Sequence, residues 1–526
     1  MNHSKIKVAP ILSIAAIALL ACIATIAMPT QASAQSAAQP QHTLAAQLPL
    51  SGRAGNSGSV TAIETPIAGT TNSVTTINPS VQIQGPFTGS SSSTAKLPFN
   101  GKLSLRDAIE RGLNFNLGAT NFNRTVRQAQ GQSEIARSAL LPNVSGYLAE
   151  SLQQANLAAE GLRIHIPIPG FSFPTIVGPY NNIDLRGSVS QSILDLTAWN
   201  NYRSSKEEYH AAQFSARDAR DQVVLAVCGA YLQIIATQER VAAAHAQFDT
   251  ADALLQQTQQ KRAVGLSPQI DVDRSEVEQL TQQQRIVSLE MELAKEKILL
   301  ARVTGLPPND SFELTDEVPF AAAPSLALDD ALHQAFASRS DIKAAEAQIR
   351  AAEHARTAAR DERLPALSVN GNYGAIGTNP AQAAATFSAV ATLSVPIWAG
   401  GRAQGDVKQA DAALDQRRAE LEDLKGQVES DVRNAYLELQ AATSQVKLAQ
   451  RNLQVSQETL DLTRQRFDAG VTDNVEVVQA QESLTSAQLD VINSDFAHNV
   501  AKLSLARAIA NNPDNLQQFL SALSLK

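Results

Sequence analysis

The sequence contains one long segment twice, and this duplication restricts the fold more than any other feature. Residues 223–302 return about 205 positions later with much of their chemistry kept. The triplet Ala-Tyr-Leu occurs at 230–232 and again at 435–437, and Gly265 has its counterpart in Gly470. The chain therefore consists of two copies of one structural unit rather than several unrelated domains.

A second offset shows where each copy begins. The stretch 103–142 matches 326–365 with an offset of about 223. The two offsets differ, so copy one carries an insertion, which we place in the Pro- and Gly-rich stretch His165–Tyr180. The predicted organisation is repeat 1 at 101–310, a linker at 311–325, repeat 2 at 326–512 and a C-terminal tail at 513–526.

The N-terminus has the pattern of a secretory signal peptide. Two lysines precede an apolar run over 8–28, and a small-residue cleavage site ends at Ala34, so we predict a signal peptide at 1–34. A lipoprotein-type site, with lipidation of Cys22, is the alternative. Cleavage at Ala34 leaves Cys228 as the one cysteine of the mature chain, which excludes a disulfide within a monomer.

Composition excludes several other classes of protein. The net charge of -8 argues against a nucleic-acid-binding surface. Residues 35–100 are rich in Ser, Thr, Gly and Pro, and we expect them to be disordered or draped over the surface. The sequence has no P-loop, nucleophile elbow, dinucleotide motif or metal-ligand spacing, so we predict no enzymatic activity, no cofactor and no metal site.

Each copy contains a pair of short segments in which apolar and polar residues alternate. In copy two these are 367–375 and 387–395, and in copy one 183–193 alternates in the same way while the strand from Val144 is less regular. A sheet half-buried on a soluble core is one interpretation. The length of about 9 to 11 residues and the export signal favour membrane-spanning strands. The insertion at His165–Tyr180 then predicts one long external loop per chain.

The remaining parts of each copy predict helices. Each copy opens with one helix, at Leu103–Leu140 and Leu326–Arg363, and its strand pair is followed by a much longer one, at Leu196–Val264 and Arg402–Ala469. Both long helices carry a strict heptad in which large and small residues alternate, which is typical of antiparallel coiled-coil packing. Each ends at a glycine, and a return helix of about 36 residues follows.

Four strands per chain cannot close a barrel, and an open sheet edge in lipid is unfavourable. We therefore expect several chains to share one barrel, while dimers, trimers and tetramers all remain compatible with the periodicity.

The duplicated order of these elements resembles the TolC family of outer-membrane efflux proteins over about 103–512. The junctions SQSILDL from Ser190 and SVPIWAGGRA from Ser394, and the tip segments KRAVGLSPQIDV and QRFDAGVTDNVEVVQAQ, carry the resemblance. It implies a mainly α-helical chain with membrane β-structure, in which a homotrimer forms a 12-stranded β-barrel in outer-membrane lipid and an α-barrel in the periplasm. It also implies a passive exit channel for efflux or type I secretion, completed by a periplasmic adaptor (membrane fusion protein) and an inner-membrane pump.

The resemblance also implies an acidic aperture at the periplasmic end. Glu476 matches the family position, with Asp473 nearby and Asp271 as the counterpart in copy one. Gln479 occupies the position where a second acid would be expected, so the resemblance does not decide whether there is a second acidic ring. The alternative for Asp271 and its neighbour Asp273 is that acids in a first helical turn complement the helix dipole.

Two further sets of residues are candidates for contacts. Gly265, Leu266, Gly470 and Val471 lie at the ends of the long helices, where apolar residues beside a glycine turn suit an adaptor; ordinary helix capping is the alternative.

Trp199 and Trp398 lie near strand ends, as interfacial aromatics do, although packing at the strand-to-helix junction would also place them there.

Two other functions fit parts of the pattern. Heptads alone would suit a structural coiled-coil surface protein or adhesin, but such a stalk has no use for strand pairs. A periplasmic adaptor subunit needs β-rich domains flanking one helical hairpin, whereas here both copies contain their own strands. The sequence does not identify the cargo.

Overall fold

A computed structural model describes residues 60–67, 76–91, 99, 101–157, 159, 161, 175–307, 311–316, 326–472 and 474–509. The chain divides into two compact units, 1–43 and 44–526, and every described residue belongs to the second. The predicted signal peptide, lipidation at Cys22 and the C-terminal tail lie outside the described residues.

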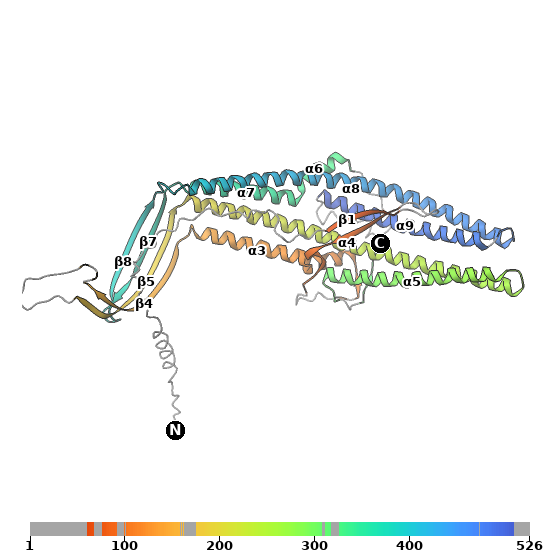
Figure 1. Ribbon diagram of the computed structural model, residues 1–526, viewed down its shortest axis with the longest axis horizontal. Helices are drawn as coiled ribbons and strands as arrows, with labels where there is room; N and C mark the ends of the chain where they lie inside the picture. The colour runs from red at the N-terminus through yellow and green to blue at the C-terminus, as the bar shows by residue number, and fades with distance from the viewer. Residues whose placement is uncertain are drawn as a thin grey trace, which may run out of the picture. The chain divides into compact units, whose positions relative to one another are not determined.

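The two repeats contain the same elements in the same order (Figure 1), which confirms the duplication. Repeat 1 comprises α2 (Leu105–Phe115), α3 (Leu117–Ser138), β4 (Asn143–Asn156), β5 (Ile176–Leu194), α4 (Leu196–Ala263) and α5 (Gln269–Thr304). Repeat 2 comprises α6 (Leu328–Ser338), α7 (Ser340–Asp361), β7 (Ala366–Gly377), β8 (Ala384–Ser394), α8 (Arg402–Asp468) and α9 (Asn474–Ala508).

The first helix of each repeat is broken, and the prediction of one continuous helix there was wrong. Asn116 and Arg339 adopt extended backbone conformations, with ψ near 135° and 129°, and separate α2 from α3 and α6 from α7. The buried Asn116 side chain accepts a hydrogen bond from the N–H of Gly118 and donates to the carbonyl of Phe87 at 2.8 Å. Tertiary hydrogen bonds to the side chain thus compensate for the interrupted helical ones.

The four long strands form one antiparallel sheet in the order β4-β5-β7-β8. Its strands have 14, 19, 12 and 11 residues, so the predicted length holds for β8 and is too short for the other three. Since β5 begins at Ile176, the predicted loop boundary at Tyr180 was wrong, and 165–174 lies outside the described residues. β4 and β8 are the two edges of the sheet.

One face of the sheet is apolar and exposed. Register places Leu148 opposite Leu185 and Tyr373 opposite Phe387 on this face, and all four side chains are more than half exposed. The opposite face is polar, and the hydroxyls of Ser145 and Ser188 lie 2.7 Å apart across it. The exposed apolar face suits lipid and does not fit the interpretation of a sheet half-buried on a soluble core.

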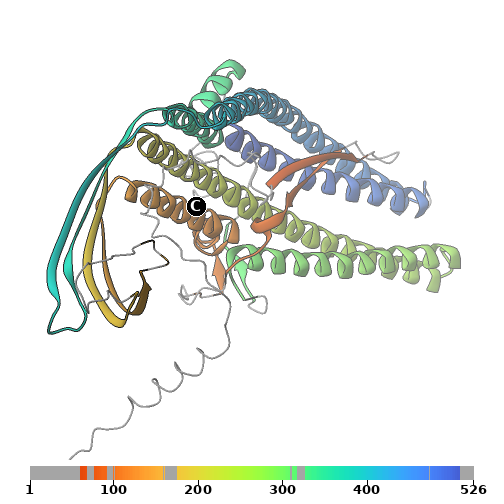
Figure 2. The ribbon, with the colours of Figure 1, turned by 60° about the vertical axis from the view of Figure 1, so that its left-hand side comes forward.

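The two longest helices hold the helical part together (Figure 2). α4 has 68 residues and packs against α3 and α7 in its first half and against α5 and α9 in its second, while α8 has 67 and packs against α7 and α9. An 18-residue stretch of α4 has the hydropathy of a membrane span, but 72% of it is buried among the other elements, so it belongs to the core.

The heptads predicted from the sequence form the buried seams. The buried heptad positions of α4 are Val223, Val227, Ala230, Ile234, Thr237, Ala244, Ala251, Leu255 and Thr258. Those of α8 are Val428, Val432, Ala435, Leu439, Ala442, Val446, Ala449, Leu460 and Thr463. The predicted alternation of large and small side chains thus lies in the buried seams of both helices.

A small β-structure surrounds the middle of α4. Strands β1 (Val60–Ile67) and β2 (Thr76–Ile83) form a hairpin, a 3-10 helix η1 spans Gly85–Thr88, and β3 (Lys102–Leu103) pairs in parallel with β6 (Glu313–Leu314). Disorder was thus the wrong prediction for 60–67 and 76–91, and the predicted linker contains a strand. Phe87 and Tyr231 are fully buried in this core, and the Tyr231 hydroxyl donates to the Leu103 carbonyl at 3.0 Å. The few apolar residues of an otherwise polar segment are sufficient to anchor it.

Candidate functional site

The ends of the two long helices are the first candidate site, and both have the same cap. Gly265 and Gly470 have positive φ values of 77° and 70°. The N–H of Leu266 donates to the Lys261 carbonyl at 2.8 Å, and that of Val471 donates to the Arg466 carbonyl at 2.9 Å, which is the Schellman pattern. The glycines therefore cap both helices, as the alternative to an adaptor contact predicted.

The same turns leave apolar side chains uncovered. Leu266 is 78% exposed and Val471 is 68% exposed. Capping requires the glycines but does not require these side chains. A contact with another molecule explains them better than capping alone.

The aperture candidates lie directly beyond these turns. The Glu476 side chain is 47% exposed, and its carboxylate accepts a hydrogen bond from the Arg466 guanidinium at 3.1 Å. In the Asp271 side chain, one oxygen accepts from the Ser267 hydroxyl at 3.0 Å and the other lies 3.9 Å from Arg274. The contacts of Asp271 are local and typical of an acid at a helix start. Glu476 instead links α9 to α8 through Arg466. Asp473 lies outside the described residues.

Polar side chains that the sequence did not single out join the two repeats at this end. Asn474 is 1% exposed and donates to the Asp271 carbonyl at 3.3 Å and to the Ser275 hydroxyl at 3.1 Å. Gln257 of α4 donates to the Asp468 carboxylate of α8 at 3.1 Å. An asparagine at a helix start is usually interpreted as a cap, so no local pattern reveals that Asn474 contacts the other repeat.

The aromatic candidates lie at the strand-to-helix junctions. Trp398 is 87% exposed and its neighbour Ile397 is 95% exposed, while Trp199 is half exposed and its ring centroid lies 6.2 Å from that of Tyr202. Trp398 thus has the exposure expected of an interfacial residue, and Trp199 combines exposure with packing.

A second apolar stripe on each of two helices was also missed. On α5 the exposed side chains follow a spacing of three and four residues on the face opposite the buried seam: Ile270, Val277, Leu280, Val287, Met291 and Ile298, each 50% to 63% exposed. On α8 an exposed stripe contains Leu437, Leu448, Val455 and Leu462, which are 43% to 62% exposed. Helices with two apolar stripes need a second partner, and within the chain each stripe is open to solvent.

A buried ionic network joins α4, α7, α8 and α9 in the middle of the helical part. Arg507 lies 2.5 Å from Asp218, and Arg339 lies 2.6 Å from Asp341. Burial acts to lower the pKa of Arg507, but Asp218 and Asp341 outweigh it and raise that pKa. Burial raises the pKa of Asp221 in the same network to about 6. The network is structural, because it lies inside the helix packing and does not line the helix tips.

Two other buried groups among the described residues, Cys228 and His498, have shifted pKa values. Cys228 is fully buried, and burial raises the pKa of its thiol to about 12. Burial and the nearby Lys502 lower the pKa of His498 to about 4, so its imidazole is neutral at physiological pH. In the part of the chain that the structure describes, no group of three or more His, Cys, Asp or Glu side chains could hold a metal ion.

Comparison with known proteins agrees with this arrangement. The sequence profile described as "Outer membrane efflux protein" matches residues 113–306 and 331–511, which correspond to the two repeats. The pyoverdine export outer membrane protein OpmQ of Pseudomonas aeruginosa is 24% identical over 417 residues, covering 75% of this chain and 82% of the relative. The outer membrane protein TolC of Vibrio cholerae is 24% identical over 330 residues, covering 61% and 75%.

Solved structures have the same fold. The outer membrane channel CmeC of Campylobacter jejuni aligns with a TM-score of 0.67 at 16% identity, covering 80% of this chain and 90% of that one. VceC of Vibrio cholerae aligns with a TM-score of 0.66 at 17% identity, covering 77% and 95%. The profile covers most of the chain and these channels share its duplicated architecture, so this chain is an outer-membrane exit channel that belongs to the outer membrane efflux protein family.

Proposed function

We propose that three copies of this outer-membrane channel assemble into one passive duct, which receives cargo from a pump and releases it outside the cell without chemical change. One observation carries the proposal: the four-stranded sheet has an exposed apolar face and two open edges, β4 and β8. Such a sheet can be stable in lipid only when its edges are paired, and three copies supply 12 strands.

The open stripes on α5 and α8 support closure of the helical part in the same way. Near the tips, contacts between the helices give the order α5, α4, α9, α8. The stripe on α5 therefore faces outward at one end of this row, and the stripe on α8 faces outward at the other. Chain direction alternates along the row, because α4 and α8 run toward the tips and α5 and α9 run back. When α8 of one copy packs against α5 of the next, that alternation continues. An interface between two different faces generates a closed ring when the rotation between copies closes.

The partners follow from the positions of the exposed residues. We infer that a periplasmic adaptor contacts the turns at Gly265–Leu266 and Gly470–Val471, and that an inner-membrane pump acts through it. Trp398 and Trp199 would lie at the lipid interface. One relative is described as a toluene efflux pump component and another as a pyoverdine exporter, so we propose small organic molecules as the cargo class.

Glu476 is our candidate for the narrowest part of the duct, with Asp271 and Asp473 as further candidates for the same ring. Purified protein should insert into planar lipid bilayers and conduct ions with cation selectivity. Glu476→Ala should lower the ratio of cation to anion permeability by roughly twofold or more, because three carboxylates disappear and three Arg466 side chains lose their partner.

Glu290→Gln is the matched control, since Glu290 is an exposed acid of α5 away from the tips, and its selectivity should equal that of the wild type. Unchanged selectivity and conductance in Glu476→Ala would show that Glu476 does not line the aperture. A monomer that inserts no conductance at all would disprove the duct itself.

A further inference from the structure

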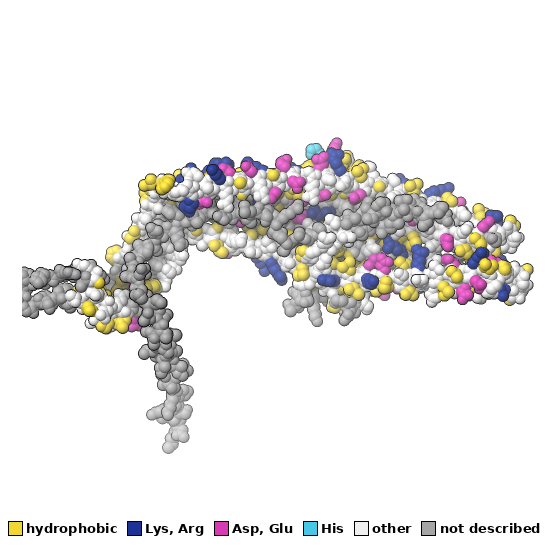
Figure 3. Space-filling view, in the orientation of Figure 1, with side chains coloured by type: hydrophobic (Ala, Val, Ile, Leu, Met, Phe, Trp, Pro, Cys, Tyr) yellow, Lys and Arg dark blue, Asp and Glu magenta, His cyan; other side chains and the backbone are white. Residues whose placement is uncertain are grey.

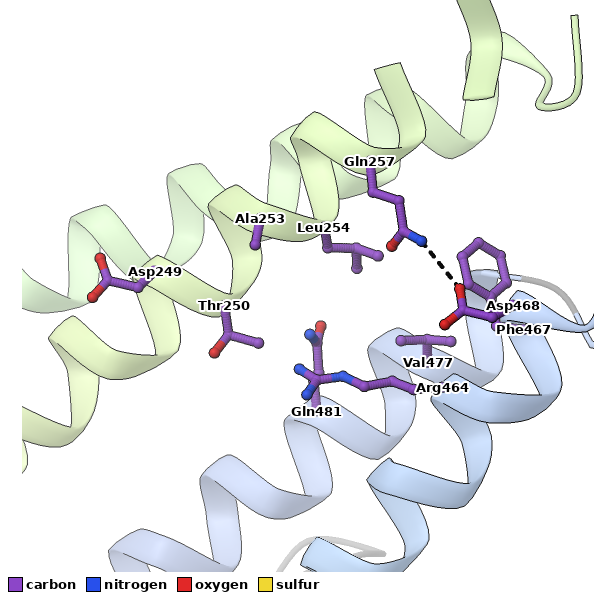
Figure 4. A pocket seen from close by; sticks show the side chains of 10 residues that line it. All are labelled: Asp249, Thr250, Ala253, Leu254, Gln257, Arg464, Phe467, Asp468, Val477 and Gln481. Carbon is purple, nitrogen blue, oxygen red and sulfur yellow. Dashed lines mark hydrogen bonds between the residues drawn. The ribbon is translucent and has the colours of Figure 1, made fainter. Parts of the chain in front are cut away.

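A cavity lies between the two repeats, close to the helix tips (Figure 4). Its volume is about 380 Å³, which is sufficient for a small organic molecule. It is lined by side chains of α4, α8 and α9: Asp249, Thr250, Ala253, Leu254, Gln257, Arg464, Phe467, Asp468, Val477 and Gln481. A ligand here would therefore touch both repeats at once.

The cavity has an apolar part and a polar part. Leu254, Phe467 and Val477 provide the apolar surface. Gln481 extends from α9 toward α4, and Arg464 extends from α8 into the same space (Figure 4). This pairing of an apolar wall with a few converging polar groups is typical of small-molecule sites.

Gln481 is the observation that points to a ligand. It is 8% exposed, and its side-chain oxygen has no hydrogen-bond partner among the described residues. A buried amide oxygen without a partner is unfavourable by about 1–3 kcal/mol. A ligand that donates a hydrogen bond to it would remove that cost.

The charges of the lining favour an anion beside Arg464. Arg464 forms no ion pair with the described residues. The Asp468 carboxylate accepts from Gln257 at 3.1 Å and lies 3.8 Å from Lys261, so its charge is already offset. Asp249 lies at the end of the cavity away from Asp468 (Figure 4). A carboxylate beside Arg464 would pair with an arginine that has no ion-pair partner of its own among the described residues.

The cavity stays open in the proposed ring. The α8 stripe that would pack against the next copy contains Leu448, Val455 and Leu462. None of these side chains lines the cavity, whose α8 residues lie on another face of the helix. Assembly therefore leaves the site available.

We propose that this cavity binds small amphipathic 2-hydroxycarboxylates. The carboxylate pairs with Arg464, the hydroxyl donates to the oxygen of Gln481, and the apolar body lies against Leu254 and Phe467. The bound molecule bridges α4 to α8 and α9 and so holds the two repeats together near the tips. By holding the repeats together, the bound molecule inhibits opening of the channel. This inhibitory effect rests on the proposed function, whereas binding at the cavity does not.

The binding test uses three probes that share one apolar body, added to the purified full-length protein in detergent. 3-Phenyllactate carries both polar groups, 3-phenylpropionate lacks the hydroxyl and 3-phenylpropane-1,2-diol lacks the charge. Saturation-transfer NMR titrations should give a Kd for 3-phenyllactate of about 1 mM, with the other two probes weaker by about fivefold or more.

Two variants separate the two polar contacts. Arg464→Met should weaken 3-phenyllactate about tenfold and remove its advantage over the diol, because the ion pair is lost. Gln481→Leu should remove its advantage over 3-phenylpropionate while keeping the preference for a carboxylate. Lys447→Met, an exposed α8 position outside the cavity, is the matched control and should bind as the wild type does. Thermal midpoints no lower than that of the wild type verify that every variant folds.

Three results would overturn the site: no saturable binding of 3-phenyllactate up to about 20 times the expected Kd, equal affinity of all three probes, or unchanged affinity in both cavity variants. Bilayer recordings then test the effect on transport, and 3-phenyllactate should lower the open-channel current of the wild type but not of Arg464→Met. Binding without an effect on current would refute the inhibitory role only. A protein that binds the probe but forms no channel would refute the proposed function and leave the site intact.

Discussion

Replacing Leu448 and Leu462 with aspartate is expected to convert the assembled protein into single chains. Both residues belong to the exposed stripe of α8 and are 60% and 61% exposed in the single chain. Burial of one leucine contributes about 1.5–3 kcal/mol, and a buried unpaired carboxylate is costlier still. The proposed ring contains three copies of this interface, so the loss is multiplied. Light scattering coupled to size exclusion in detergent measures the mass of the assembly.

Gln450→Asp is the matched control for these substitutions. Gln450 is an exposed residue of α8, close to Leu448 in the chain but outside the stripe, and its replacement adds the same charge. It should leave the mass unchanged. An intact assembly in the Leu448→Asp, Leu462→Asp double variant would mean that α8 does not form the joint between copies.

Arg507→Met is expected to destabilise the helical part strongly. Arg507 is largely buried and lies 2.5 Å from Asp218, with Asp221 and Asp341 in the same network. Removing one partner of a buried ion pair costs about 3–5 kcal/mol, because the remaining carboxylates stay buried without a counter-charge. The midpoint of thermal unfolding, followed by circular dichroism at 222 nm, should fall markedly at pH 7.

The pH dependence of this variant tests the cause. Without Arg507 the folded-state pKa values of the neighbouring carboxyls rise, and a raised carboxyl pKa contributes stability that is present at low pH and lost as the pH increases. The deficit of Arg507→Met should therefore shrink between pH 7 and pH 5. Arg433→Met removes an exposed i,i+4 partner of Glu429 at 2.8 Å and should change stability by less than about 0.5 kcal/mol. Equal deficits in the two variants would contradict the network.

Much of the helical fold could be predicted because its signals are periodic. The heptads of α4 and α8 recur over many turns, and glycines mark the ends of both helices. The breaks at Asn116 and Arg339 escaped prediction because neither residue stops a helix by itself. Their extended backbones are held by contacts with residues distant in the chain, such as Phe87 and Asp431. Local sequence does not report such contacts.

The candidate sites were predictable to a lesser extent. The exposed Leu266 and Val471 could be found because they lie beside glycine turns. The contact of Asn474 with Ser275 depends on how the two repeats meet, which no local pattern encodes. The second stripe of α8 could have been detected from the spacing of Leu448, Val455 and Leu462. The stronger buried seam of the same helix concealed it.

The pairing of β5 with β7 has a consequence for the symmetry of the assembled ring. Within one chain, β5 of repeat 1 pairs with β7 of repeat 2. If β8 of one copy pairs with β4 of the next in the same way, three chains form a pseudo-sixfold ring of strand hairpins. Ser190 corresponds to Ser394 with an offset of 204, and Pro142 to Pro365 with an offset of 223. The observed pairing of Val189 with Gly371 then transfers to Leu393 of one copy and Leu148 of the next. Both leucines already lie on the apolar face of the sheet, so this register would continue that face around the ring.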